Sequence, residues 1–407
     1  SRHVIAKDLI EEVWKDMEST ILPSWIDPPP HNWGTKAAGK LSADEWKVVC
    51  SISLVITLIR IWGYKYQHQQ QSRHFQLLLN FLDLVHAIQL LNLRETSVDI
   101  GKRYQFLILQ YLHNVLELFP DVSLKPNHHY AIHIAEDLDL MGPVHARNTP
   151  IFERTNHFLQ EVKSNKHLGK LTFTVIYVSC ITGEVEATMQ KAYCQEGMLH
   201  VILEHSPDLQ DDIKEALDAL HEIKQENHRG MFAEADLSSW SSSAHKFKSS
   251  PIVITSATLD QIVELLCDEH GVPHSIWEDK LSRDAFSLGG VTHDGVIFSL
   301  STRQSSVVYR KSQEEYGAGI IQRIISHEYW HPTLQKPKAT IYLEVLEMTP
   351  INSEDDLYRK LKCGWLCLRQ PGPPRLVPLL QVISQFVKTN LLINGQPLTH
   401  VYPMPKV

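Results

Sequence analysis

The sequence predicts an α+β protein whose N-terminal two thirds are mainly helical and whose C-terminal third is a small β-barrel of SH3-like size. Through the first part of the chain, apolar residues recur at three- and four-residue steps, the period of amphipathic helices. After residue 256, one short helix is followed by β-branched and aromatic runs separated by Gly, Pro and Asn. A Ser-rich stretch, "LSSWSSSAHKFKSS", separates the helical pattern from the β-rich pattern.

The first helical region covers residues 1–125. Its clearest helix is "LSADEWKVVCSISLVITLIRIWG", where Ser42 is the expected N-cap, Glu45 completes a capping box and Gly63 marks the expected end. Two further amphipathic segments follow, "RHFQLLLNFLDLVHAIQLLNL" and "VDIGKRYQFLILQYLHNVLELFP". A helical bundle is the simplest packing for three such segments.

The remaining domain boundaries follow changes in the sequence pattern. Residues 126–236 contain a second helical set, which begins with "HHYAIHIAEDLDLMG" and ends with "PDLQDDIKEALDALHEIKQEN". Residues 237–255 form the Ser-rich linker, and residues 256–407 form the β-rich module. Short strands at this spacing are typical of a barrel and not of a parallel sheet.

Composition places the chain among ordinary globular proteins, with 407 residues, 43% hydrophobic residues and a formal net charge of -8. Because the net charge is negative, any role in nucleic-acid binding must depend on local basic patches. The six cysteines are spread thinly, which favours a reducing compartment. No signal peptide is evident, and the longest apolar run is shorter than the roughly 20 residues of a membrane span. We therefore expect a soluble nuclear or cytoplasmic protein that is not secreted and has no membrane contact.

Two motifs contain residues that could bind a metal. His129 and His133 in "NHHYAIH" lie four residues apart, on one face of a helix, as zinc ligands can. However, Tyr130 stands where an HExxH site needs Glu, so packing or hydrogen-bonding histidines are the alternative. In "CGWLC", Cys363 and Cys367 have no second cysteine pair nearby, which favours a barrel core over a metal knuckle.

Two other stretches are interpreted as parts of the fold and not as binding or catalytic sites. The glycines of "GAGII", residues 317–321, predict a turn between strands, because no helix follows that could form a phosphate loop. Asp8 and Asp16 lie in a charge-rich helical pattern typical of a solvated face.

A longer resemblance covers most of the chain. "KPNHHYAIHIAEDLDLMGPVHARNTPIFERTNHFLQEVKSNKHLG", followed by "EVEATMQKAYCQ", resembles the characteristic block of CACTA-type (En/Spm-like) DNA transposases in their fungal form. "HVIAKDLIEEVWKDM" resembles the helical region before that block, and "YGAGIIQRI" and "HVYPMPK" resemble the β-rich C-terminal module. The resemblance implies an all-α insertion in residues 1–125, the end of an RNase H-like core in residues 126–236, and a C-terminal SH3/BAH-like barrel.

The resemblance also implies a catalytic site, because such a core binds two Mg2+ or Mn2+ ions through three acidic residues. Glu153 falls where the third acid belongs, and Arg154 would orient it or bind a phosphate. Glu184 and Glu186 are second-choice acids. A salt bridge on a helix surface is the structural alternative for Glu153.

The implied partners are transposon-end DNA and further transposase subunits, through self-association. In this family two aspartates precede the helical insertion, so we expect them upstream of Ser1 and expect this chain to be inactive alone. The basic side chains that could contact DNA phosphates are Lys163, Lys166, Lys170, Arg303, Arg310, Lys311 and Arg323.

Two alternatives to a transposase part are open. One is a transposase-derived, non-catalytic module that binds DNA or protein, which the acidic charge favours. The other is a zinc hydrolase that uses His129 and His133.

Residues 170–183, "KLTFTVIYVSCITG", interrupt the family pattern and are either a translated intron or a genuine strand. Comparing transcript with genomic DNA across codons 169 to 184 distinguishes these two origins.

Overall fold

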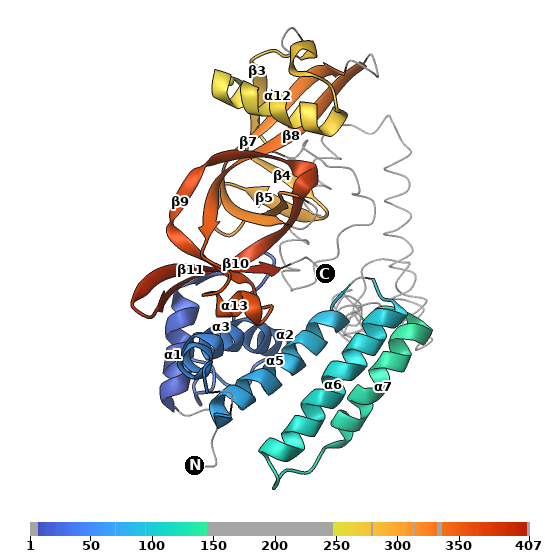
Figure 1. The fold of residues 1–407 in the computed structure, drawn as a ribbon, viewed down its shortest axis with the longest axis vertical. Coiled ribbons are helices and arrows are strands. Elements are labelled where there is room, and N and C mark those ends of the chain that lie inside the picture. The colour runs from blue at the N-terminus through green and yellow to red at the C-terminus, as the bar shows by residue number, and fades with distance from the viewer. Residues whose placement is uncertain are drawn as a thin grey trace, which may run out of the picture. The chain divides into compact units, whose positions relative to one another are not determined.

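The computed structural model describes residues 7–69, 71–93, 95–144, 247–277, 280–312, 315–331 and 336–404. It confirms a mixed α+β protein, with helices in the N-terminal part and a closed β-barrel in the C-terminal part (Figure 1). The chain divides into two compact units, Ser1–His86 with Leu107–Leu124 and Gly230–Val407, and Ala87–Phe106 with Lys125–Arg229.

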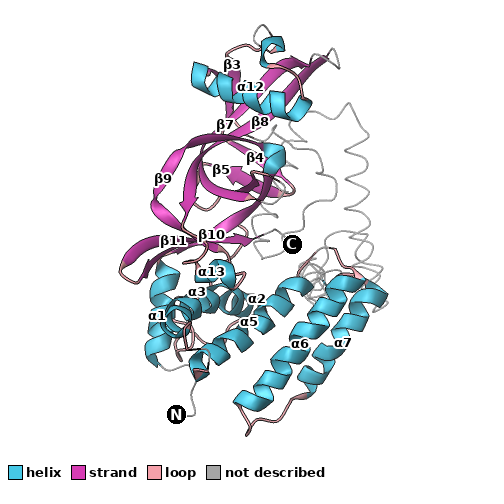
Figure 2. Ribbon diagram, in the orientation of Figure 1, coloured by secondary structure: helices cyan, strands magenta, loops and turns pink. Residues whose placement is uncertain are grey.

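Figure 2 shows how helices and strands are distributed along the chain. The α-helices are α1 (Lys7–Glu18), α2 (Ala43–Val48), α3 (Leu54–Leu58), α4 (Tyr64–Tyr66), α5 (Arg73–Leu91), α6 (Val98–Leu118), α7 (Pro126–Met141), α12 (Ser256–His270) and α13 (Leu357–Lys360). Other helical turns are the π-helical η1 (Val49–Ser53) and η2 (Ile59–Gly63), and the 3-10 helical η5 (His274–Ile276) and η6 (Leu379–Gln381). The strands are β1 (Thr20–Ile21), β2 (Ser249–Val253), β3 (Asp284–Leu288), β4 (Gly290–His293), β5 (Val296–Ser299), β6 (Ser306–Arg310), β7 (Tyr316–His331), β8 (Lys336–Pro350), β9 (Trp365–Pro378), β10 (Val382–Ile393) and β11 (Gln396–Met404).

The capping box predicted at Ser42 is confirmed at the start of α2. The Ser42 hydroxyl accepts from the backbone N–H of Glu45 at 3.3 Å, and the Glu45 carboxylate accepts from the N–H of Ser42 at 2.6 Å. The predicted end at Gly63 is wrong, because helical structure continues to Tyr66. Gly63 serves close packing instead, since a Cβ there would lie 2.8 Å from a methyl carbon of Leu357.

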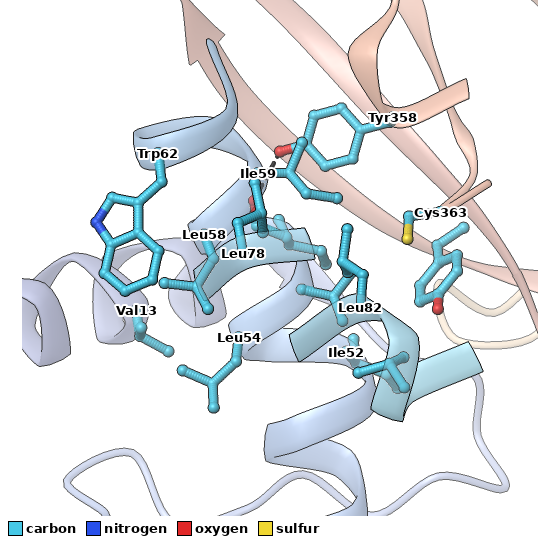
Figure 3. Close-up of a cluster of buried hydrophobic side chains, with 14 of the residues drawn as sticks. Val13, Ile52, Leu54, Leu58, Ile59, Trp62, Leu78, Leu82, Tyr358 and Cys363 are labelled. Atoms are coloured by element: carbon cyan, nitrogen blue, oxygen red, sulfur yellow. Dashed lines mark hydrogen bonds between the residues drawn. The ribbon is translucent and has the colours of Figure 1, made fainter. Parts of the chain in front are cut away.

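Length and composition alone would let two described helices cross a membrane, Ala43–Tyr66 and Arg73–Leu91. In the first, 67% of the most apolar window is buried within the protein. Figure 3 shows its side chains, among them Ile52 and Leu58, in one buried cluster with Leu78 of α5 and Tyr358 of α13. Packing in a core accounts for the apolar character of this helix.

The charge-rich face of α1 is not solvated at Asp16, contrary to the sequence expectation. Asp16 is buried, and its Oδ2 accepts from Thr57 Oγ1 at 2.8 Å and from Arg60 Nε at 2.9 Å. A second nitrogen of Arg60 donates to Glu12 at 2.9 Å. Burial raises the pKa of Asp16 despite the neighbouring guanidinium. Arg60 therefore supplies the positive charge that offsets the cost of burying the Asp16 carboxylate.

The barrel closes through antiparallel pairs that run β6, β7, β8, β9, β11, β10 and back to β6. Its apolar interior consists of inward-facing side chains from several strands, with the β4–β5 hairpin packed among them. The buried members are Leu288, Val291, Val296, Phe298, Val307, Tyr309, Ile321, Ile324, Leu343, Val345, Val377, Leu379 and Val382.

A bulge divides strand β7 into two parts with different partners. Its register with β8 shifts between Ile321 and Arg323; before the shift β7 pairs with β6, and beyond it with β3. The extra residue lets a strand bend and twist, so β7 can belong both to the barrel and to an extension of the same sheet.

The turn predicted for "GAGII" is wrong, because Gly317 and Gly319 lie inside β7. A Cβ on Gly319 would stand 2.8 Å from the carbonyl oxygen of Leu346 on the neighbouring strand. These glycines therefore allow close strand packing where the barrel closes.

Beyond the bulge, β8, β7, β3 and β2 form an extension of the sheet, which we call the upper sheet (Figure 1). The predicted short helix is confirmed as α12, which starts at the N-cap Thr255 and ends at Gly271 with φ +63°. It packs on one face of the upper sheet, over the buried side chains of Trp277, Tyr329 and Tyr342.

A buried histidine lies where β11 meets the turn before β9. The Nε2 atom of His400 is 2.7 Å from the carbonyl oxygen of Cys363, so Nε2 carries the proton in the neutral ring. Burial lowers the pKa of His400 to about 4. The folded protein therefore holds this ring neutral below the pH at which a free histidine becomes charged.

The Arg60–Asp16 pair leads to a stability prediction. In Arg60→Met, Asp16 keeps its buried position but loses its cation, so we expect the free energy of unfolding at neutral pH to fall by about 3 kcal/mol. Lys15→Met is the matched control, because Lys15 contacts Glu12 at the exposed side of α1 and its loss should change little. Urea denaturation measures both, and equal losses in the two variants would contradict the role given to Arg60.

His400 predicts a pH dependence. Its pKa of about 4 in the folded state lies below the ordinary value of 6.5, so the unfolded chain binds the proton first as the pH falls. The stabilisation is complete above about pH 6.5 and is lost progressively toward pH 4, by an amount on the order of 3 kcal/mol. His400→Gln keeps a donor for the Cys363 carbonyl without titrating and should flatten this slope. His68→Gln, at an exposed position, should not, and identical slopes in both variants would refute the assignment.

Candidate functional site

The acidic site expected from the resemblance lies outside the described residues. This applies to Glu153 and Arg154, to Glu184 and Glu186, and to the inserted segment 170–183. The basic residues Lys163, Lys166 and Lys170 lie outside them as well. Their roles stay predictions.

Arg303, a candidate for phosphate contact, binds the N-terminal part of the chain. Its guanidinium donates to the carbonyl oxygens of Leu22 at 3.2 Å, Pro23 at 3.0 Å and Ile26 at 2.5 Å. The carbonyl of Arg303 in turn accepts from the N–H of Ser24 at 3.0 Å. Arg303 thus fastens the segment after β1 to the barrel, and a phosphate would have to displace these carbonyls.

Lys311 and Arg323 also have partners within the barrel. The ammonium of Lys311 forms an ion pair with Glu347, and Arg323 donates twice to one oxygen of Glu344, at 2.9 and 2.6 Å. The Arg323 bonds directly follow the bulge in β7, where they hold the new register to β8. Arg310, at the end of β6, is exposed.

The two histidines of the zinc alternative share one face of α7, as predicted. Their Nε2 atoms lie 3.3 Å apart, and His133 Nδ1 lies 3.5 Å from a carboxylate oxygen of Glu136. Both rings are exposed. Within the described ranges, no group of three or more His, Cys, Asp or Glu residues is placed to hold a metal ion.

The interpretation of "CGWLC" as barrel core is confirmed for Cys367, which packs among barrel strands, whereas Cys363 lies before β9 in the core shared with the N-terminal helices. Cys363 and Cys367 are fully buried and free. Burial raises the pKa of each thiol to about 12, which keeps them protonated.

A groove of about 750 Å³ lies on the upper sheet. It crosses strands β2, β3, β7 and β8. The residues that line it are Pro251, Ile252, Val253, Ser282, Asp284, Ala285, Phe286, Ser326, Glu328 and Ala339.

Strand alternation explains why the groove lies on the face opposite α12. Ile325 and Tyr329 of β7 point into the core beneath that helix, and Ser326 and Glu328, between them, point to the other face. On β3, Ala285 packs toward α12. Ser326 and Glu328 therefore reach the groove because their side chains point away from the α12 core.

The groove has exposed apolar walls. Val253 is 70% exposed and Phe286 is 49% exposed. Pro251 lies directly across from Phe286 in the β2–β3 pair. A contiguous apolar surface on a sheet face is typical of a binding site.

Two carboxylates lie in the same groove. Asp284 on β3 and Glu328 on β7 both line it, each two residues beyond the pair Phe286–Ser326, at which the printed β3–β7 register ends. Ser282 donates to Asp284 at 2.7 Å. Two carboxylates in one groove favour the binding of a cation over that of an anion.

The outer edge of β2 is blunted by a proline. Ile254 donates to the carbonyl of Arg283, so Ile254 and every second residue before it bond to β3. The backbone groups of Pro251 and Val253 therefore point to the free edge, where Pro251 offers no N–H. A full ladder of hydrogen bonds to an added strand is interrupted at this position.

The sequence did not predict the groove, because it does not show which face of these strands another element covers. In "DAFSL" and "ISHEYW", Phe286 and Trp330 alternate with buried residues, a pattern that fits a two-sided strand. Only the position of α12 decides which face stays open.

Comparison with protein-family models, with curated proteins and with solved structures finds no match to this chain.

The groove carboxylates lead to a stability prediction. Glu328 is exposed, so we expect Glu328→Gln to leave the free energy of unfolding within about 0.5 kcal/mol of the parent chain. Glu344→Gln is the control of matched chemistry on the adjacent strand; it weakens two bonds from Arg323 and should lower stability by about 1–2 kcal/mol. Thermal and urea unfolding of both variants give the test, and a loss of stability in Glu328→Gln would show that Glu328 is structural.

Proposed function

We propose that this chain is the C-terminal portion of a CACTA-type transposase-like protein, and that this portion acts as a non-catalytic binding module. Its partner would be a protein segment, bound on the upper sheet.

The observation that carries the proposal is the contrast between two sets of charges. The barrel cations Arg303, Lys311 and Arg323 are engaged by carbonyl and carboxylate oxygens of the chain itself, so they stabilise the fold. The groove, in contrast, presents Asp284 and Glu328 beside apolar walls. Such a surface repels DNA phosphates and is suited to a protein ligand.

The architecture supports a binding role for physical reasons. The groove is built on strands that continue from the closed barrel, and α12 covers their other face. Side chains placed on such strands are held more rigidly than side chains on loops, which lowers the entropy cost of binding.

The second candidate function is metal-dependent DNA cleavage and strand transfer by a complete transposase. The motif order from "KPNHHY" to "EVEATM" favours it. In that function Glu153 would bind Mg2+ or Mn2+ together with two aspartates, and Arg154 would contact phosphate or orient the acid.

DNA binding and cleavage by the full chain test the proposal. We expect weak binding to duplex DNA, with a shallow dependence on salt, because few phosphates are neutralised. Arg310→Gln, at an exposed position, and Arg323→Gln, at a paired position, should both leave this affinity within about twofold of the parent. With Mg2+ we expect no strand cleavage above background, and Glu153→Gln should match the parent chain. Steep salt dependence, or Mg2+-dependent nicking that Glu153→Gln abolishes, would overturn the proposal in favour of the second candidate.

A further inference from the structure

The groove on the upper sheet combines apolar walls with two carboxylates, and this combination indicates the chemistry of its ligand. We propose that it binds an extended protein segment that presents lysine or arginine, with the cationic head between Asp284 and Glu328. This inference rests on the proposed function and specifies the partner of the same site.

The apolar walls suit the stem of a long basic side chain. Val253, Pro251 and Phe286 provide the wall on β2 and β3. Lysine and arginine pack their methylene groups against such surfaces while the charged end reaches polar groups. A cation near the ring of Phe286 gains further attraction from the face of the aromatic system.

The charges favour a cationic ligand over a neutral one. Other carboxylates on these strands have internal cations, as Glu344 has Arg323 and Glu347 has Lys311. By contrast, among the residues found to line the groove no lysine or arginine accompanies Asp284 and Glu328. A bound cation would therefore be attracted by two carboxylates that no lysine or arginine among these lining residues neutralises.

The backbone decides how the segment lies. Because Pro251 has no N–H to donate at the free edge of β2, an added strand would lose a bond in the middle of its ladder. We therefore place the segment across the face of the upper sheet, held by side-chain contacts, and not along its edge. Recognition would then depend on side-chain charge more than on backbone pairing.

A fluorescence anisotropy experiment on the full chain tests this inference. The probe is a fluorescein-labelled peptide, Gly-Val-Lys-Val-Lys-Val-Gly, and the matched probes replace both lysines with norleucine or with glutamate. We expect the lysine peptide to bind about tenfold more tightly than the norleucine peptide, and the glutamate peptide not to bind.

Variants of the chain locate the site. Asp284→Asn combined with Glu328→Gln should weaken lysine-peptide binding about tenfold, to the level of the norleucine peptide. Glu354→Gln combined with Asp355→Asn removes two exposed carboxylates elsewhere and should leave the affinity unchanged. Phe286→Ser should weaken the lysine and norleucine peptides alike, because the ring contacts the stem and not only the charge.

The outcomes separate this inference from the proposed function. Equal binding of lysine and norleucine peptides, abolished in Phe286→Ser, would overturn the cationic ligand and leave protein binding by the groove intact. Lysine-peptide binding that Asp284→Asn with Glu328→Gln does not weaken would place the site elsewhere and overturn the inference. Self-association lost in Phe286→Ser, without binding of any peptide, would overturn it in favour of a second copy of the chain.

Discussion

The structure of the C-terminal module depends on two paired strands, β7 and β8, that run from the barrel into the upper sheet. Strand β7 closes the barrel against β6 in its first part and supports the upper sheet against β3 in its second part. The bulge after Ile321 allows this change of partner, and the bonds from Arg323 to Glu344 fix the register beyond it. Without these two shared strands, α12 and the groove would have no rigid connection to the barrel.

The N-terminal helices up to His86 and the barrel share one hydrophobic core, although they lie far apart in the sequence. Leu54 and Leu78 pack in the same cluster as Leu366 and Val387 of the barrel strands. Strand β1 pairs with β10, and Arg303 binds the segment that follows it. The first helices therefore stabilise the module that carries the groove.

Charges in this protein serve different purposes according to burial and partners. Arg60 compensates the buried carboxylate of Asp16, and so preserves the packing of α1 on the helix that contains Arg60. On the barrel, basic side chains that looked suited to phosphate bind oxygens of the chain itself. In the groove, Asp284 and Glu328 lie together on the open face. Net charge does not distinguish these cases, because each depends on neighbours that come from other segments.

The sequence by itself determined the local features: the capping box at Ser42, helix α12, the β-rich texture of the last third and the buried cysteines of "CGWLC". These features depend on the spacing of apolar residues, on helix-cap chemistry and on hydrophobicity. All three are set by residues that lie close together in the sequence. Tertiary structure alone decided that Asp16 is buried, that Gly319 lies within a strand, and that Arg303 binds backbone carbonyls. It also decided the groove, because an alternating strand shows two faces in its sequence, and only the packing of α12 determines which of them stays open.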